Sequence, residues 1–147
     1  MKIMVIHGPN LNMLGEREPD VYGRATLADI NDMLAEKAAE KGVQLVVRQS
    51  NSEGDITGWI QQLSPPVKGL IINPAAFTHY SIAIRDALSN LSIPVVEVHL
   101  SNIYAREEFR RHSVTAPVVQ GQISGFGPES YLLALDAIVY LLEGRER

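Results

Sequence analysis

The chain has 147 residues, of which 46% are hydrophobic and 20% charged, and this is the composition of an ordinary globular domain. Its formal net charge of −4 argues against a nucleic-acid partner, and the lack of cysteine excludes disulfides, thiolate nucleophiles and cysteine-ligated metals. No stretch approaches the ~20 apolar residues that cross a membrane, and the N-terminus shows no signal-peptide pattern. We therefore expect one cytoplasmic domain over residues 1–147.

Short apolar runs alternate with helical patterns along the whole chain. Strands are predicted at Lys2–His7, Val43–Val47, Val67–Ile72, Val95–Val98 and Val118–Val119. Thr26 and Ser52 each precede an aspartate by three positions, as in a capping box, and each opens a predicted helix. Further helices are predicted at Ile82–Leu88, Arg106–His112 and Glu129–Glu143. The alternation predicts an α/β, flavodoxin-like three-layer sandwich, with a parallel five-stranded sheet of order 2-1-3-4-5.

The segment between the first strand and the first helix is unusually long. It runs from Gly8 to Gly23, whereas connections of this kind usually take about 2–6 residues. The excess length predicts a binding or lid loop. This loop carries Arg17, a permanent cation, and Tyr22, a phenol that acts as a base once its proton is loosened.

The last predicted helix is apolar around more of its circumference than a surface helix needs. Its apolar residues are Leu132, Leu133, Leu135, Ile138, Val139, Leu141 and Leu142. Two interpretations stay open: the helix is sunk against the sheet, or another subunit covers its outer face.

Polar side chains stand where several predicted strands end, at the sheet edge where this architecture places chemistry. Glu97 and His99 are two apart on an extended segment and therefore face the same side. A carboxylate beside an imidazole fixes its tautomer and favours its protonated form, which suits a general acid. A purely structural ion pair is the competing interpretation. Asn73 either holds a hydroxyl or water, or simply ends its strand before Pro74.

Several further polar residues have a plain structural alternative. Thr78, His79 and Ser81 precede a helix and suit caps, whereas Asp86 and Arg110 suit solvated surfaces. Leu100 and Ser101 offer backbone N–H groups and a hydroxyl to an anion.

Known cofactor and nucleophile motifs are missing from the sequence. The four histidines (7, 79, 99 and 112) match no metal-ligand spacing, and no G-x-G-x-x-G, P-loop or G-x-S-x-G pattern occurs. We expect neither a metal nor a cofactor. A set of Tyr, Arg, His, Glu and Asn around one crevice suits proton abstraction beside a carbonyl and proton delivery to a leaving group.

Three long strings carry a family resemblance that spans essentially the entire chain. They are GPNLNMLGEREPDVYG, INPAAFTHYSIAIRDAL and VVEVHLSNIYAREEFRRHSVTAPVVQGQISGFG. Together they resemble the type II 3-dehydroquinate dehydratases of the shikimate and quinate pathways. The resemblance implies a flavodoxin-like fold, a homododecamer built as a tetramer of trimers, and no cofactor. The implied reaction is anti elimination of water from 3-dehydroquinate, through an enolate, to give 3-dehydroshikimate.

The same resemblance implies a role for each matching residue. Tyr22 matches the base, Arg17 the lid arginine that activates it, and Asn10 the residue that holds a water at the enolate oxygen. His99 matches the general acid and Glu97 its orienting partner. The implied substrate contacts are Asn73, His79, Asp86, Leu100, Ser101 and Arg110, with Asp86 reaching the site of a neighbouring subunit.

The chain departs from the family pattern at four positions. Ser52 stands where many members have His, and Ala75, Phe77 and Tyr104 replace Gly, Tyr and His. Since Phe77 and Tyr104 are expected near the pocket, we expect these changes to affect the affinity for ligands rather than the type of reaction. The alternative functions are a flavodoxin-like binding module for a phosphorylated ligand or flavin, and an interaction scaffold.

Overall fold

Five parallel strands form one sheet in the order β2-β1-β3-β4-β5, as the sequence predicts. The computed structural model describes residues 1–16 and 18–146, without the side chains of residues 22 and 146. The strands are β1 (Lys2–His7), β2 (Gln44–Gln49), β3 (Val67–Asn73), β4 (Val95–His99) and β5 (Gly121–Ser124). All of them run in the same direction, so their carboxyl ends meet at one edge.

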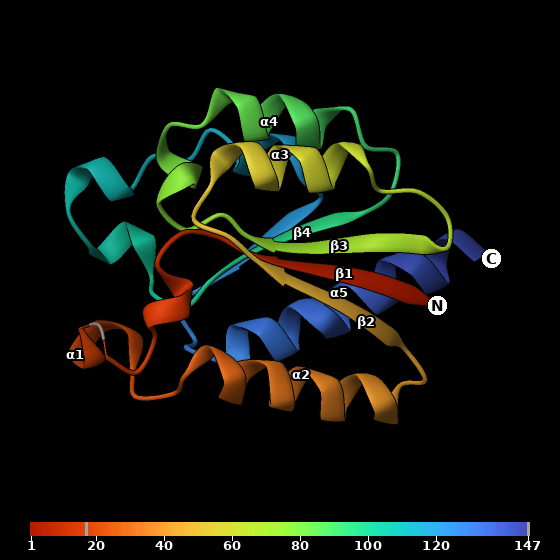
Figure 1. Ribbon diagram of the computed structural model, residues 1–147, viewed down its shortest axis with the longest axis horizontal. Coiled ribbons are helices and arrows are strands. Elements are labelled where there is room, and N and C mark those ends of the chain that lie inside the picture. Colours follow the sequence, from red (N-terminus) through yellow and green to blue (C-terminus); the bar gives the residue numbers. More distant parts are fainter. Residues whose placement is uncertain (17, 147) are drawn as a thin grey trace.

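Two pairs of helices cover the two faces of the sheet (Figure 1). Helices α2 (Leu27–Glu40) and α5 (Glu129–Glu146) lie on one face, and α3 (Glu53–Gln61) and α4 (Ile82–Ser89) on the other. A separate apolar cluster fills each interface: Ile71, Val96 and Leu135 belong to the first, and Ile72, Ile60 and Ile84 to the second. The predicted three-layer sandwich is therefore confirmed.

The predicted helix starts have their capping bonds. Thr26 accepts a hydrogen bond from the Asp29 N–H, and the Asp29 carboxylate accepts one from the Thr26 N–H, which completes a capping box. Ser52 likewise accepts from the N–H of Asp55 and opens α3.

Helix α5 packs mainly against the sheet and α2, which supports the interpretation that it is sunk into the fold. Leu135 and Ile138 are fully buried and Leu142 nearly so. Two large hydrophobic side chains of this helix remain exposed, Leu133 at 37% and Tyr140 at 75%.

Two predicted elements are wrong. The fifth strand is not Val118–Val119, because Val118 is the last residue of a 3-10 turn, Ala116–Val118. Pro117 lies in this turn, and its missing N–H suits a turn better than a strand. Strand β5 instead starts at Gly121, where pairing with β4 outweighs a weak local preference for strand.

The charged segment Arg106–His112 is not a helix. Arg106 is extended, and only the 3-10 turn Glu108–Arg110 follows it. One ion pair between Arg110 and Glu107 does not offset the missing apolar face, because every residue of that turn lies at the surface.

The carboxyl ends of β1 and β3 approach each other closely at Gly8. A Cβ there would lie 2.7 Å from the Pro74 carbonyl oxygen, so only glycine fits. The Gly8 N–H donates to the Asn73 carbonyl at 2.8 Å and joins the two strand ends. In the part of the chain that the structure describes, no helix combines the length and apolar content needed to cross a bilayer.

Candidate active site

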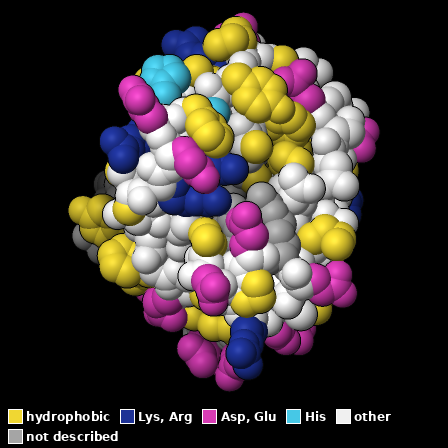
Figure 2. All heavy atoms as spheres, turned by 90° about the vertical axis from the view of Figure 1, so that its left-hand side faces the viewer, with side chains coloured by type: hydrophobic (Ala, Val, Ile, Leu, Met, Phe, Trp, Pro, Cys, Tyr) yellow, Lys and Arg dark blue, Asp and Glu magenta, His cyan; other side chains and the backbone are white. Residues whose placement is uncertain are grey.

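A pocket opens at the carboxyl ends of β1, β3 and β4. It is lined by Pro9, Asn10, Leu11, Asn73, Ala75, Ala76, His79, His99, Leu100, Ser101, Ile103, Arg106 and Arg110. Figure 2 looks onto this edge and shows His and Lys or Arg side chains gathered on the same half of the surface. Seven of the predicted site residues are therefore brought to one pocket: Asn10, Asn73, His79, His99, Leu100, Ser101 and Arg110.

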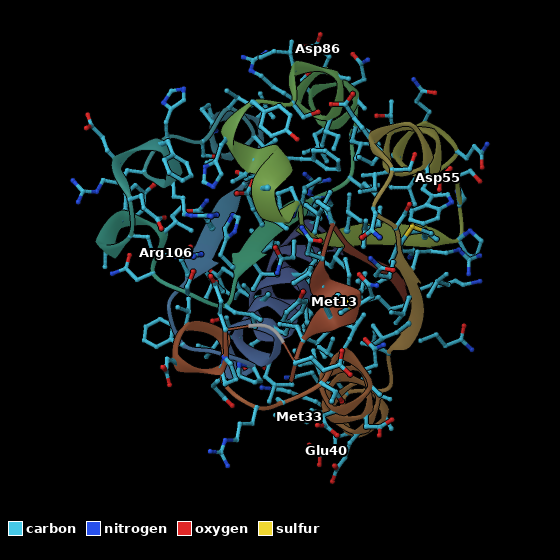
Figure 3. The ribbon with its side chains drawn as sticks, turned by 60° about the vertical axis from the view of Figure 1, so that its left-hand side comes forward. Met13, Met33, Glu40, Asp55, Asp86 and Arg106 are labelled. Atoms are coloured by element: carbon cyan, nitrogen blue, oxygen red, sulfur yellow. The ribbon has the colours of Figure 1, made fainter. Side chains whose placement is uncertain are left out.

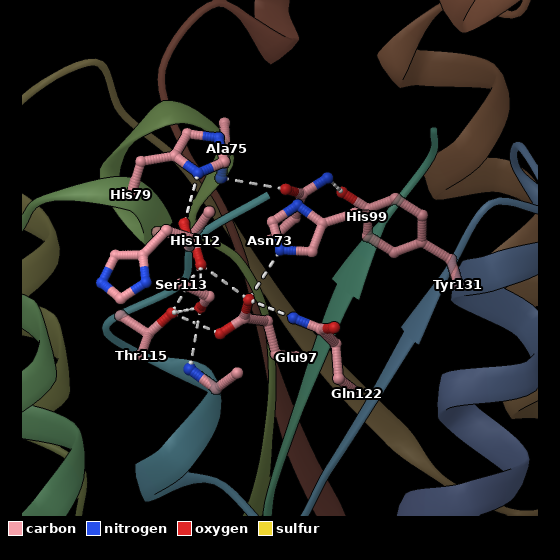
Figure 4. Close-up of polar contacts among 12 residues, drawn as sticks. Asn73, Ala75, His79, Glu97, His99, His112, Ser113, Thr115, Gln122 and Tyr131 are labelled. Carbon is pink, nitrogen blue, oxygen red and sulfur yellow. Dashed lines mark hydrogen bonds and ion pairs between the residues drawn. The ribbon is translucent and has the colours of Figure 1, made fainter. Parts of the chain in front are cut away.

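Glu97 and His99 form a buried pair at the base of this pocket. The Nε2 atom of His99 lies 2.6 Å from Oε2 of Glu97, and the two residues are 5% and 0% exposed. Figure 4 shows the second ring nitrogen on the side of the imidazole away from Glu97. The carboxylate therefore fixes the Nε2–H form and leaves Nδ1 as the nitrogen that exchanges a proton.

Three other side chains donate hydrogen bonds to the Glu97 carboxylate (Figure 4). Thr115 donates to Oε1, whereas Thr78 and Gln122 donate to Oε2, each at 2.8 Å. Burial alone raises the pKa of Glu97, but the hydrogen bond and charge of His99 and the two threonine hydrogen bonds hold that pKa below its ordinary value. Glu97 is thus ionised although fully buried.

The two asparagines of the site are held in different ways. Asn73 is 2% exposed; its Oδ1 accepts from the Ala75 N–H and its Nδ2 donates to the Tyr131 hydroxyl, both at 3.0 Å. Asn10 is exposed and has the left-handed φ of 67°. Its backbone N–H donates to Oδ1 of Asn51, so the main chain is anchored while the side chain is available to the pocket.

His79 and Arg110 stand on the rim of the pocket. The Nδ1 atom of His79 lies 2.8 Å from the carbonyl oxygen of His112. Partial burial lowers the pKa of His79 despite that hydrogen bond, so the ring is neutral, with Nδ1–H donating and Nε2 left as an acceptor. The Nε atom of Arg110 donates to Glu107, which orients the guanidinium.

Three predicted site residues are placed neither in this pocket nor at its base. Asp86 is exposed on α4 beside Arg85, away from the pocket residue Arg106 (Figure 3). Arg17 lies outside the described residues, as does the side chain of Tyr22. The short helix α1 (Pro19–Tyr22) follows Glu18, whose carboxylate lies 3.6 Å from the guanidinium of Arg106. This contact ties the long loop to the pocket rim.

The four departures from the family pattern have distinct local consequences. Ser52 caps α3, so its hydroxyl has a structural use. Ala75 lines the pocket at φ 51°, a left-handed conformation that a glycine would adopt without strain. Phe77 is 9% exposed in the core and Tyr104 is 54% exposed, and neither lines the pocket. Each adjoins a lining residue in the chain, Ala76 and Ile103 respectively, so both lie near the pocket without forming its wall.

Sequence reasoning missed five residues that support the site. Thr115, Gln122, Tyr131 and His7 contact Glu97, Asn73 or their partners, and Arg106 lines the pocket. Thr78 was expected only to cap, yet Ser81 is the cap of α4 and Thr78 binds Glu97. Only the strand ends gave a usable signal, because Thr115, Gln122 and Tyr131 reach the site from a turn, from β5 and from α5, far along the chain from their partners. Within residues 1–16 and 18–146, no three His, Asp or Glu side chains converge as metal ligands do.

Comparison with known proteins shows the family to which the chain belongs. The family model described as dehydroquinase class II matches residues 1–139. The 3-dehydroquinate dehydratase of Pelotomaculum thermopropionicum is 57% identical over 96% of this chain and 98% of the relative, and that of Halalkalibacterium halodurans is 57% identical over 99% and 98%. The crystal structure of type II dehydroquinase from Butyrivibrio crossotus superposes with a TM-score of 0.92 at 48% identity, covering 94% of this chain and 97% of that one. On this evidence the chain belongs to the class II dehydroquinase family.

Proposed function

We propose that the chain dehydrates 3-dehydroquinate to 3-dehydroshikimate without a cofactor, as a step of the shikimate pathway. Membership of the family supports the reaction, and one observation carries the chemistry. A buried, ionised Glu97 holds His99 in the pocket, with one ring nitrogen fixed and the other left to transfer a proton. A histidine held in this way is suited to protonate a departing hydroxyl group.

The reaction begins with removal of a proton from the carbon beside the ketone. We assign this step to Tyr22 on the strength of the family resemblance. A free phenol has a pKa near ~10 and therefore needs activation. Arg17 is the proposed activator, since a nearby cation favours tyrosinate. The ion pair of Glu18 with Arg106 supports the placement of this segment over the pocket.

Loss of the proton leaves an enolate, whose oxygen needs stabilisation. Asn10 is the proposed residue that holds a water there, and its anchored backbone and exposed side chain at the pocket support the role. The enolate then expels the hydroxyl group on the neighbouring carbon. That group takes the proton from Nδ1 of His99 and leaves as water, so charge and protons balance.

The remaining pocket residues are proposed to bind the substrate. Arg110 and the Leu100–Ser101 segment are suited to the carboxylate and hydroxyl groups, because they supply a cation, backbone N–H groups and a hydroxyl at the rim. His79 offers Nε2 as an acceptor for a substrate hydroxyl. Asn73 positions both the substrate and the acid.

Asp86 supports a proposal about assembly. It is exposed on α4, where it lies near the exposed apolar side chains Ile82 (54%) and Tyr80 (61%) along the chain. We infer that this part of α4 meets a neighbouring subunit and that Asp86 completes its site, as in a dodecamer built from four trimers. The proposed location is the cytoplasm.

Ultraviolet absorbance tests the proposed function, because 3-dehydroshikimate is a conjugated enone and 3-dehydroquinate is not. Purified, assembled protein should produce a steady rise in absorbance when 3-dehydroquinate is added. Folded protein that gives no rise, and instead carries a flavin or a phosphorylated ligand, would overturn the proposal.

A further inference from the structure

Away from the pocket, the Asn73 amide is hydrogen-bonded to a series of buried polar side chains. Its Nδ2 donates to the hydroxyl of Tyr131 on α5 at 3.0 Å. That hydroxyl lies 2.8 Å from Nδ1 of His7, and Nε2 of His7 lies 2.8 Å from Oδ1 of Asn31 on α2. Tyr131 and His7 are both fully buried. The proposed reaction uses neither of them.

Each hydrogen bond in this series of side chains has only one possible direction. The Ala75 N–H can only donate, so Oδ1 of Asn73 accepts from it and Nδ2 must face Tyr131. The Tyr131 hydroxyl accepts that bond, and its own proton therefore goes to Nδ1 of His7. His7 is then neutral, with Nε2–H donating to Asn31.

Protonation of His7 would break this order. An Nδ1–H would meet a hydroxyl that already accepts from Asn73, and the Tyr131 proton would lose its acceptor in a fully buried site. Burial lowers the pKa of His7 to about 4, although the bond to Asn31 opposes this, so the ring is neutral at neutral pH.

The result is an amide group held on both ends. Rotation of the Asn73 side chain by 180° would put its NH₂ against the Ala75 N–H and leave two donors facing each other. Among the described residues, one N–H of Nδ2 and one lone pair of Oδ1 have no partner, and Asn73 lines the same pocket as His99 (Figure 4). The side chain therefore presents these groups to a ligand at a fixed angle.

We propose that Tyr131 is a positioning residue, which sets the orientation of the Asn73 amide in the pocket and is itself oriented by His7. This inference rests on the proposed function, because the kinetic consequence needs the substrate. In this account, side chains on each face of the sheet orient one residue of the site. The network around Glu97 holds the acid from the α3–α4 side, and the chain through Tyr131 holds Asn73 from the α2–α5 side.

The test is a double-mutant cycle on steady-state kinetics with 3-dehydroquinate. Tyr131→Phe keeps the ring and removes the hydroxyl, and we expect it to lower kcat/KM about tenfold, the value of roughly one hydrogen bond. Asn73→Ala should lower kcat/KM further. Because Tyr131 acts through Asn73, adding Tyr131→Phe to Asn73→Ala should lower kcat/KM by less than about twofold. Tyr140→Phe is the matched control, since it makes the same change on an exposed tyrosine of the same helix.

The outcomes separate the two proposals. A wild-type protein that does not dehydrate 3-dehydroquinate would refute the proposed function alone. An active wild type in which Tyr131→Phe keeps full kcat/KM, or lowers it equally with and without Asn73, would overturn the positioning role and leave only a structural one. Where Tyr131→Phe does not fold, His7→Leu removes the acceptor of the hydroxyl instead. We expect about a threefold loss of kcat/KM from it, which also disappears beside Asn73→Ala; unchanged or additive kinetics would again overturn the role.

Discussion

Replacing Glu97 by glutamine isolates the charge of the buried carboxylate from its shape. The side chain is fully buried and accepts hydrogen bonds from His99, Thr115, Thr78 and Gln122. In Glu97→Gln the amide oxygen can occupy the Oε2 position, and the NH₂ group then faces Thr115, whose hydroxyl can rotate to accept. The variant should therefore fold.

What this variant loses is the charged partner of the imidazole. A hydrogen bond to a charged group contributes about 1.5–3 kcal/mol and a neutral one about 0.5–1.5 kcal/mol, and the charge also stabilises the imidazolium. A loss of about 2 kcal/mol corresponds to about a 30-fold lower kcat. The loss should fall on kcat more than on KM, because Glu97 does not itself line the pocket.

The absorbance assay for the conjugated enone, with Glu36→Gln on the exposed side of α2 as the isosteric control, measures this effect. Thermal unfolding of both variants establishes that they are folded. A Glu97→Gln enzyme with the kcat of the control would refute the view that the carboxylate charge supports the acid.

Three further predictions concern stability and assembly. The pKa of His7 falls from 6.5 to about 4 on folding, so between these pH values the unfolded chain binds a proton that the folded chain does not. About 3 kcal/mol of stability that is present above pH 6.5 is therefore lost as the pH falls to 4. Denaturant titrations should show this dependence of stability on pH, and an equal slope in His7→Gln would contradict the assignment to His7. Ala75→Gly should raise the free energy of unfolding by about 0.5–1 kcal/mol by removing the strain at φ 51°, and a lower value would argue against strain there. Co-expressed Asp86→Ala and His99→Ala chains should recover activity in roughly a quarter of their sites if Asp86 serves a neighbouring subunit, whereas no recovery would contradict a shared site.

The elements that sequence predicted best are those with strong local signals. Thr26 and Ser52 are followed by aspartate at the capping distance, and the helices start there. The strand order followed from the number of strands and their alternation with helices. Since parallel strands end at one edge, Asn73, Glu97 and His99 also fell where they were expected.

The errors lie where tertiary contacts outweigh local preference. Strand β5 begins with glycine and is formed by pairing with Val96 to His99, which no local pattern of Gly121–Ser124 reveals. The segment at Arg106–His112 has helix-forming residues but no apolar face to bury.

The supporting residues of the site were beyond sequence reasoning for a different reason. Tyr131 looks like one more apolar position of α5, and only the folded chain brings its hydroxyl to Asn73, 58 positions away. Thr115 and Gln122 likewise reach Glu97 from a turn and an edge strand. Hydrogen bonds between residues so far apart produce no recognisable spacing pattern in the sequence.

Solvent deuterium exchange in His99→Ala tests the central claim most directly, because it separates the two proton transfers. Folded His99→Ala protein incubated with 3-dehydroquinate in D₂O should place deuterium on the carbon beside the ketone, detected by mass spectrometry, while little 3-dehydroshikimate forms. That result is expected if His99 protonates the departing hydroxyl and another residue removes the proton. Product formation at the wild-type rate, or loss of both exchange and product, would contradict that assignment.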